Sequence, residues 1–182
     1  YSKEAIAKAI SAVEKYDEDL IERVSELESI TDRYEDKLGT FLVRLSGKNL
    51  TGKESHIIGR MLHSIGDMER LGDHAENIAM VAKELKDKNL SFSAQAKREI
   101  KVITDAIIEI VDITTDSFMH DNSDVAGSVE PLEQVIDTLR AQIQQRHIVR
   151  VQKGDCTVEM GFILSDLLNN YERVSDHCSN IA

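Results

Sequence analysis

Hydrophobic residues recur three or four positions apart along most of the chain, which is the spacing of one face of an α-helix. The longest such stripe begins at Leu20 and ends at Leu45, just before Ser46 and Gly47. Polar breaks divide the pattern into six segments, so we predict six helices and an all-α fold. The predicted helices are a first that ends before Asp17, a second over 20–46, a third that follows Thr51, a fourth from Ser91 or Ser93 to His120, a fifth from Ser123 or Ser128 to Lys153, and a sixth that follows Gly154-Asp155.

Several helix starts carry recognisable capping residues. Asp17 is expected to cap the second helix, because its carboxylate can accept a hydrogen bond from a free N–H group of the first turn. Thr51 and Glu54 have the spacing of a capping box at the start of the third helix. Gly154-Asp155 is expected to break the chain and cap the sixth helix. Pro131 is expected in the first turn of the fifth helix or at a kink ahead of Glu133, because proline lacks the N–H group that a helix interior needs.

The chain contains an internal repeat. Residues 67–79 and 170–182 are identical at seven of thirteen positions, at an offset of 103 residues. An offset of 105 residues places Glu28 and Asp32 on Glu133 and Asp137. We therefore predict two tandem three-helix bundles, residues 1–90 and 91–182, with the first and last helices cut short.

Four Glu-x-x-x-Asp pairs fall at matched positions of the two units. Residues four apart share one helix face, where like charges repel. Burying such acids between helices is costly unless they are protonated, paired with bases or bound to cations. Hard cations with oxygen ligands satisfy several carboxylates at once, so we predict one metal site in each unit. The eight predicted ligands are Glu28, Asp32, Glu69 and Asp73 in the first unit, and Glu133, Asp137, Glu172 and Asp176 in the second.

Other residues near the four Glu-x-x-x-Asp pairs give weaker indications of a metal site. Small residues such as Gly66, Gly72 and Ala75 would let the helices approach closely. Glu76 also points inward, but it matches Ser179 in the repeat and ranks below the eight acids. A second matched set would orient the carboxylates, form a partner surface or serve ordinary packing. This set consists of Arg70, His74 and Asn77, which match Arg173, His177 and Asn180.

Composition narrows the classes of function. The net charge is −11, with 33 acids against 22 bases, and we expect no basic patch, so nucleic-acid binding is excluded. Cys156 and Cys178 lack the spacing of a zinc ribbon or a disulfide framework. No apolar run reaches the roughly 18 residues that span a bilayer, so we expect no membrane insertion by this segment. We expect a cytoplasmic protein, and leave open that it is the cytoplasmic domain of an inner-membrane protein.

The segments Glu69-Arg-Leu-Gly-Asp-His-Ala-Glu-Asn-Ile-Ala and Glu172-Arg-Val-Ser-Asp-His-Cys-Ser-Asn-Ile-Ala resemble the duplicated metal-binding signature of the PhoU family. The segment from Glu130 to Asp137, followed by Arg146 to Arg150 and Gly154 to Cys156, looks most like PhoU-type domains of bacterial sodium/phosphate cotransporters. The resemblance implies paired three-helix bundles with multinuclear iron or other metal clusters on the carboxylate motifs. It also implies regulation of phosphate uptake or signalling through contacts with a phosphate transporter or its membrane portion.

We therefore expect a metal-binding regulatory or adaptor protein without catalytic residues, which binds iron, manganese, zinc or magnesium. A homodimer is left open. One alternative is a carboxylate di-metal enzyme on a helical bundle, although such enzymes usually carry Glu-x-x-His and this sequence has none. The other alternative is a helical scaffold without metal, in which the repeat serves packing alone.

Overall fold

The computed structural model describes residues 1–182, except for the side chain of Ser123. Within this range all regular structure is helical, which confirms the predicted all-α fold. The helices are α1 (Ser2–Glu14), α2 (Glu18–Ser46), α3 (Gly52–Asp87), α4 (Ala94–His120), the short α5 (Ser123–Ala126), α6 (Val129–Gln152) and α7 (Val158–Ile181). The described helices include none that is long and apolar enough to cross a membrane.

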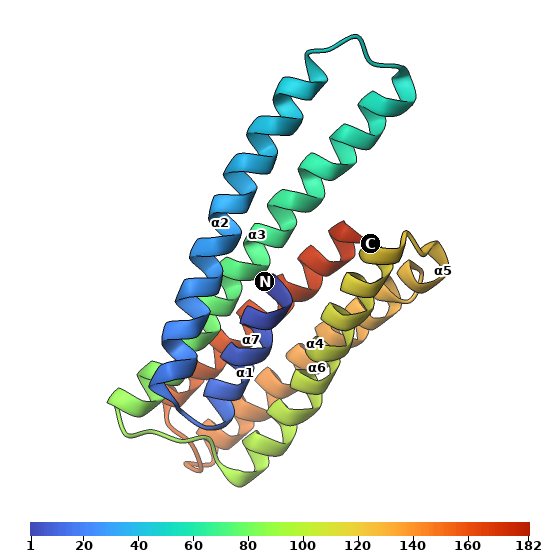
Figure 1. Cartoon of the computed structure of the whole chain (residues 1–182). Coiled ribbons are helices and arrows are strands. Elements are labelled where there is room, and N and C mark those ends of the chain that lie inside the picture. The colour runs from blue at the N-terminus through green and yellow to red at the C-terminus, as the bar shows by residue number, and fades with distance from the viewer.

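The helices form two three-helix groups that lie side by side (Figure 1). Helices α1, α2 and α3 pack against one another, and so do α4, α6 and α7. The groups meet mainly where α3 packs against α7. One hydrophobic core runs through both, from Ile6 and Leu27 to Ile136 and Leu167. The tandem helical-bundle fold is thus confirmed, whereas the boundary between residues 90 and 91 stays a prediction.

Local capping chemistry sets most helix ends. The Asp17 carboxylate accepts a hydrogen bond from the N–H group of Asp19, and Thr51 and Glu54 form the predicted capping box. Pro131 is the third residue of α6 and lies in its first turn. The predicted start of the last helix is wrong by a few residues, because Thr157 caps α7 and Gly154, at φ +77°, closes the turn after α6.

The two groups differ in the length of one helix. At the offset of 105 residues, α1 matches the second half of α4, and their buried positions agree: Ala5, Ile6, Ala9 and Ala12 against Ile110, Val111, Thr114 and Ser117. At this offset residues 94–105 of α4 align with positions ahead of Tyr1. Figure 1 shows the far end of the α2–α3 hairpin extending beyond the other helices.

Candidate metal-binding carboxylate clusters

The first cluster lies where the middle of α2 packs against α3. Burial raises the pKa of Glu28, and the nearby charges of Glu76, Asp32 and Asp73 raise it further. Burial and the neighbouring Asp73 likewise raise the pKa of Glu69, although Arg70 opposes this shift. Acids from two helices therefore share one region, as the repeat predicts.

Close helix packing at Gly72 supports this arrangement. A Cβ atom added there would lie 3.7 Å from the Cβ atom of Thr31 and 3.8 Å from the Cα atom of Glu28. The matching residue of α7, Ser175, is fully buried, and its hydroxyl donates to the Glu172 carbonyl at 2.8 Å. The expectation for Gly66 is wrong, because an added Cβ atom there would meet open space.

The second cluster lies where α6 packs against α7. Burial raises the pKa of Glu133, and the charges of Asp137, Asp176, Glu130 and Glu172 add to the shift. An open surface depression of about 380 Å³ adjoins this cluster and is lined by Glu130, Glu133, Asp176 and Arg173, among others. Space for a bound ion and its water therefore exists next to these carboxylates.

The eight predicted ligands differ in how far their side chains are buried. Asp32 and Asp137, which match each other in the repeat, are exposed. The other six are half-buried: Glu28, Glu69, Asp73, Glu133, Glu172 and Asp176. The argument that a cation must offset the cost of burying these carboxylates therefore applies to six of the eight predicted ligands.

A fifth acid adjoins each cluster, and the sequence reasoning missed its equivalence. In the first unit the Ser25 hydroxyl donates to Glu76 at 3.2 Å. In the second unit the Ser179 hydroxyl donates to Glu130 at 3.1 Å. In the repeat, Ser25 aligns with Glu130 and Glu76 aligns with Ser179. The serine is therefore on α2 in the first unit and on α7 in the second, the glutamate is on α3 and on α6, and the serine–glutamate hydrogen bond is present in both. Applying both repeat offsets together, 105 residues for α2 and 103 residues for α3, would have revealed this exchange from the sequence.

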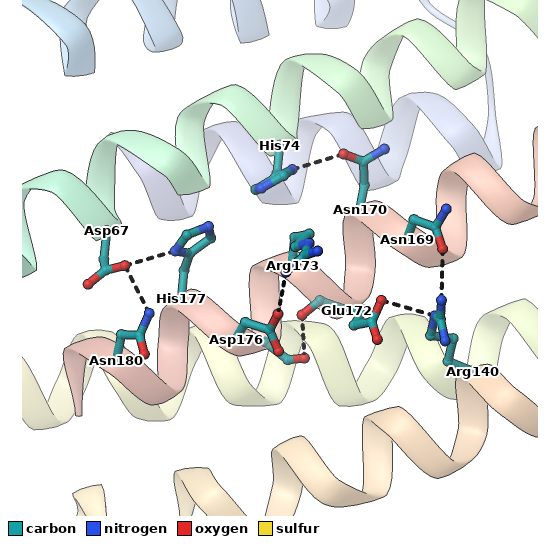
Figure 2. A network of polar contacts seen from close by, with 11 residues as sticks. Asp67, His74, Arg140, Asn169, Asn170, Glu172, Arg173, Asp176, His177 and Asn180 are labelled. Carbon is teal, nitrogen blue, oxygen red and sulfur yellow. Dashed lines mark hydrogen bonds and ion pairs between the residues drawn. The ribbon is translucent and has the colours of Figure 1, made fainter.

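Arginines neutralise part of the negative charge. Arg70 lies 3.0 Å from Asp73 and 3.5 Å from Glu69. In the second cluster, Arg173 lies 3.2 Å from Asp176 and Arg140 lies 3.2 Å from Glu172 (Figure 2). Among the described residues, no three Asp, Glu, His or Cys side chains converge closely enough to bind one ion. The acids therefore fit a hard cation in donor chemistry and charge, but their side chains would have to turn away from the arginines to bind it.

The matched histidines face the neighbouring bundle. His74 Nδ1 lies 2.9 Å from Asn170 Oδ1, and His177 Nδ1 lies 2.8 Å from Asp67 Oδ1 (Figure 2). The two imidazole rings stack with centroids 5.4 Å apart. Asp67 and Asn170 match in the repeat, so each histidine bonds the same position of the other unit. These histidines hold α3 against α7, whereas Arg70 and Arg173 contact the acids directly.

Replacing Glu28 and Glu133 with glutamine is expected to stabilise the metal-free protein near pH 7. Their pKa is higher in the folded state than in the unfolded state, so their stabilising contribution is present below about pH 4.5 and is lost as the pH rises through the raised pKa. Glutamine does not ionise, and the gain should be on the order of 0.5 kcal/mol per charge removed, the size of a like-charge pair on a helix.

Urea unfolding in EDTA at pH 4 and pH 7 measures this effect. The matched control replaces Glu22 and Glu109 with glutamine, since both are exposed acids outside the clusters. A gain that is equal at both pH values, or equal in the control, would show that Glu28 and Glu133 do not experience the clusters' charge.

The sequence and the fold of this chain are similar to those of known proteins. The model of the PhoU domain matches residues 1–82 and 100–182. The phosphate-specific transport system accessory protein PhoU homolog 1 of Thermotoga maritima is 25% identical over 182 residues, which cover 98% of this chain and 76% of that protein. The PhoU homolog of Aquifex aeolicus is 27% identical over 94% of this chain and 76% of its own length.

Solved structures show the same fold. The crystal structure of PhoU from Pseudomonas aeruginosa superposes with a TM-score of 0.91 at 22% identity, over 99% of this chain and 86% of that one. The phosphate transport system regulatory protein PhoU from Streptococcus pneumoniae gives a TM-score of 0.84 at 18% identity, over 99% and 84% of the two chains.

Proposed function

Because the chain belongs to the PhoU domain family, we propose that it is a regulatory adaptor of phosphate transport that acts through protein contacts and binds metal ions on its two carboxylate clusters. Its relatives are named accessory and regulatory proteins of phosphate transport, and their role is not catalytic. The family resemblance of the two motifs is confirmed. We assign no catalytic residue to this chain.

The observation that carries the metal proposal is the pair of carboxylate clusters at repeat-equivalent places. Each brings acids from two helices together, and in each the pKa of at least one glutamate is raised by burial and by its neighbours. A bound cation would supply positive charge and shared oxygen coordination between α2 and α3, and between α6 and α7. The residues that would hold such a cation are Glu28, Glu69 and Asp73 in the first cluster and Glu133, Glu172 and Asp176 in the second, and they would hold the paired helices together through it.

The alternatives fit the side chains less well. A di-metal enzyme would need histidines among its ligands, yet His74 and His177 bond across the α3–α7 interface. In a metal-free scaffold Arg70, Arg140 and Arg173 would offset part of the repulsion, but none of these arginines pairs with Glu28 or Glu133, whose pKa the neighbouring acids raise. The exchange of Ser25 and Glu76 for Glu130 and Ser179 also keeps the negative charge of both clusters.

The proposal includes the partner and its location. The partner is a phosphate transporter or its membrane portion, and the chain works at its cytoplasmic side. A more specific version of this proposal is that the chain is the PhoU-type domain of a sodium/phosphate cotransporter. The relatives named above are accessory proteins, so this version rests only on the resemblance of the segments around Glu130 and Arg146.

Phosphate uptake in the native host tests the regulatory role. Deleting the gene should raise uptake of radioactive phosphate in phosphate-rich medium, and restoring the wild-type gene should lower it again. A gene with Glu69→Gln, Asp73→Asn, Glu172→Gln and Asp176→Asn should fail to restore control at equal protein level. Unchanged uptake in the deletion strain would rule out the regulatory role, and full rescue by the variant would rule out the need for the clusters.

A further inference from the structure

The two carboxylate clusters differ in charge at one repeat position. At the offset of 105 residues, Glu35 of α2 matches Arg140 of α6, and both side chains are half-buried. Burial and Asp73 do most to raise the pKa of Glu69, and the charge of Glu35 adds to this shift. Glu172 matches Glu69, but it lies 3.2 Å from the Nε atom of Arg140 (Figure 2). The same glutamate of the repeated motif therefore meets an acid in the first cluster and a base in the second.

A second residue that differs between the units holds Arg140 in place. The Nη2 atom of Arg140 donates to the side-chain oxygen of Asn169 at 3.0 Å (Figure 2). At the offset of 103 residues Asn169 matches Gly66, which has no side chain that could accept such a bond. The side chains of Arg140 and Glu172 are each 27% exposed, so water screens their attraction less than that of a fully exposed pair. Arg140 and Asn169 thus form one arrangement, which the first unit replaces with glutamate and glycine.

The matched arginines Arg70 and Arg173 do not cause this difference. Each pairs with the aspartate three residues further along its helix, at 3.0 and 3.2 Å. Their side chains are 60% and 63% exposed, so each can turn into water at little cost. Their contributions to the two clusters are therefore similar, and the exchange of Glu35 for Arg140 separates the clusters in charge.

The first cluster is the more negative of the two. Glu35 is its sixth acid, and among the described residues Arg70 is the one arginine paired with it, which gives a net charge of −5. The second cluster has five acids and two arginines, Arg140 and Arg173, which gives −3. A divalent ion interacts with each of these charges twice as strongly as a monovalent ion does, so the first cluster attracts it more. At the second cluster, an ion would also have to displace Arg140 before it could bind Glu172.

We propose that Arg140 is a built-in cation of the second carboxylate cluster, held against Glu172 by Asn169, and that it makes this cluster the weaker of two metal sites. The first cluster fills at low metal concentration, and the second fills only when the concentration is high enough to displace Arg140. The chain therefore loads metal in two steps, and its second bundle responds to the metal supply. The order of loading rests on the metal binding proposed above, whereas the role of Arg140 as a counter-ion needs no bound metal.

Urea unfolding in EDTA at pH 7 tests the counter-ion role without metal. Arg140→Gln removes an attracting charge and should lower the urea midpoint, whereas Glu35→Gln removes a repelling charge at the matching position and should raise it. Each shift should be roughly 0.3 M, the effect of one partly exposed charge pair on a protein of ordinary urea dependence. Lys153→Gln, at the exposed end of α6, is the control and should leave the midpoint unchanged. Shifts of the same sign for Arg140→Gln and Glu35→Gln would overturn the counter-ion role.

Titration with Mn²⁺ tests the order of loading, with free Mn²⁺ measured by electron paramagnetic resonance. The wild type should show a tight and a weak class of site, with dissociation constants at least about tenfold apart. Arg140→Glu should tighten the weak class by at least about tenfold, because it reverses one charge beside a divalent ion, and should leave the tight class within a few-fold. Two double variants assign the classes. Glu69→Gln with Asp73→Asn should remove the tight class, and Glu172→Gln with Asp176→Asn should remove the weak one.

A matched control separates Arg140 from net charge. Lys153→Glu makes the same change of charge at an exposed position near the end of α6 and should alter the weak class by no more than a few-fold. Far-ultraviolet circular dichroism should show that all variants stay helical. Two sites of equal affinity in the wild type, or equal tightening by Lys153→Glu, would overturn the proposed order and leave metal binding intact. Absence of Mn²⁺ binding in every protein would overturn both metal binding and the order of loading, and the unfolding experiment would still decide the role of Arg140.

Discussion

Replacing Glu99 with alanine is expected to lower the free energy of unfolding by about 3–5 kcal/mol, the cost of breaking a buried ion pair from one side. Glu99 on α4 and Arg150 on α6 are each only 8% exposed, and their nearest nitrogen and oxygen atoms lie 2.8 Å apart. Gln95 also donates to Glu99 at 3.2 Å. The Nε and Nη2 atoms of Arg150 have no hydrogen-bond partner among the described residues. Without Glu99, a buried guanidinium would lose its main partner.

Urea unfolding measures this loss. The matched control is Asp105→Ala, which breaks an exposed pair with Lys101 on the same helix and should cost about 1 kcal/mol or less. Replacing Glu99 with leucine together with Arg150 with methionine should recover much of the loss, because it removes both charges at once. A loss for Glu99→Ala that is no larger than the control's would show that the pair is hydrated in solution.

Much of the fold could be predicted because helical burial is a local, periodic signal. The stripe from Leu20 to Leu45, the caps at Asp17 and Thr51 and the repeat around Asp73 and Asp176 needed no knowledge of tertiary contacts. The repeat also indicated correctly that acids of α2 lie near acids of α3.

Features that depend on partners distant in the sequence could not be found this way. Glu99 and Arg150 are 51 residues apart and look like ordinary surface charges in a helical pattern. The exposure of Asp32 and Asp137 depends on how each helix is rotated about its axis, which a periodic pattern fixes only roughly.

Metal binding is expected to raise the stability of the wild-type protein substantially. An ion present at 100 times its dissociation constant adds about 2.7 kcal/mol if it binds only the folded state. For a chain of this length, that corresponds to a rise in Tm of roughly 5–10 °C. EDTA should reverse the rise, because the added stability exists only while the ion is bound.

The same effect should be absent when the four predicted ligands of α3 and α7 are neutralised. The variant replaces Glu69 and Glu172 with glutamine and Asp73 and Asp176 with asparagine. Its control makes the same type of change at four exposed acids outside the clusters: Glu22, Glu109, Asp105 and Glu159. Metal should stabilise the control as it does the wild type, and should leave the Tm of the cluster variant unchanged. Equal stabilisation of both variants would place the ion elsewhere on the molecule.

Elemental analysis by plasma mass spectrometry tests the proposed metal sites most directly. The purified, untagged protein should retain iron, manganese, zinc or magnesium after desalting, and the variant lacking the charges of Glu69, Asp73, Glu172 and Asp176 should retain none. If neither protein holds metal, even after reconstitution with each ion in turn, the carboxylate clusters are not metal sites.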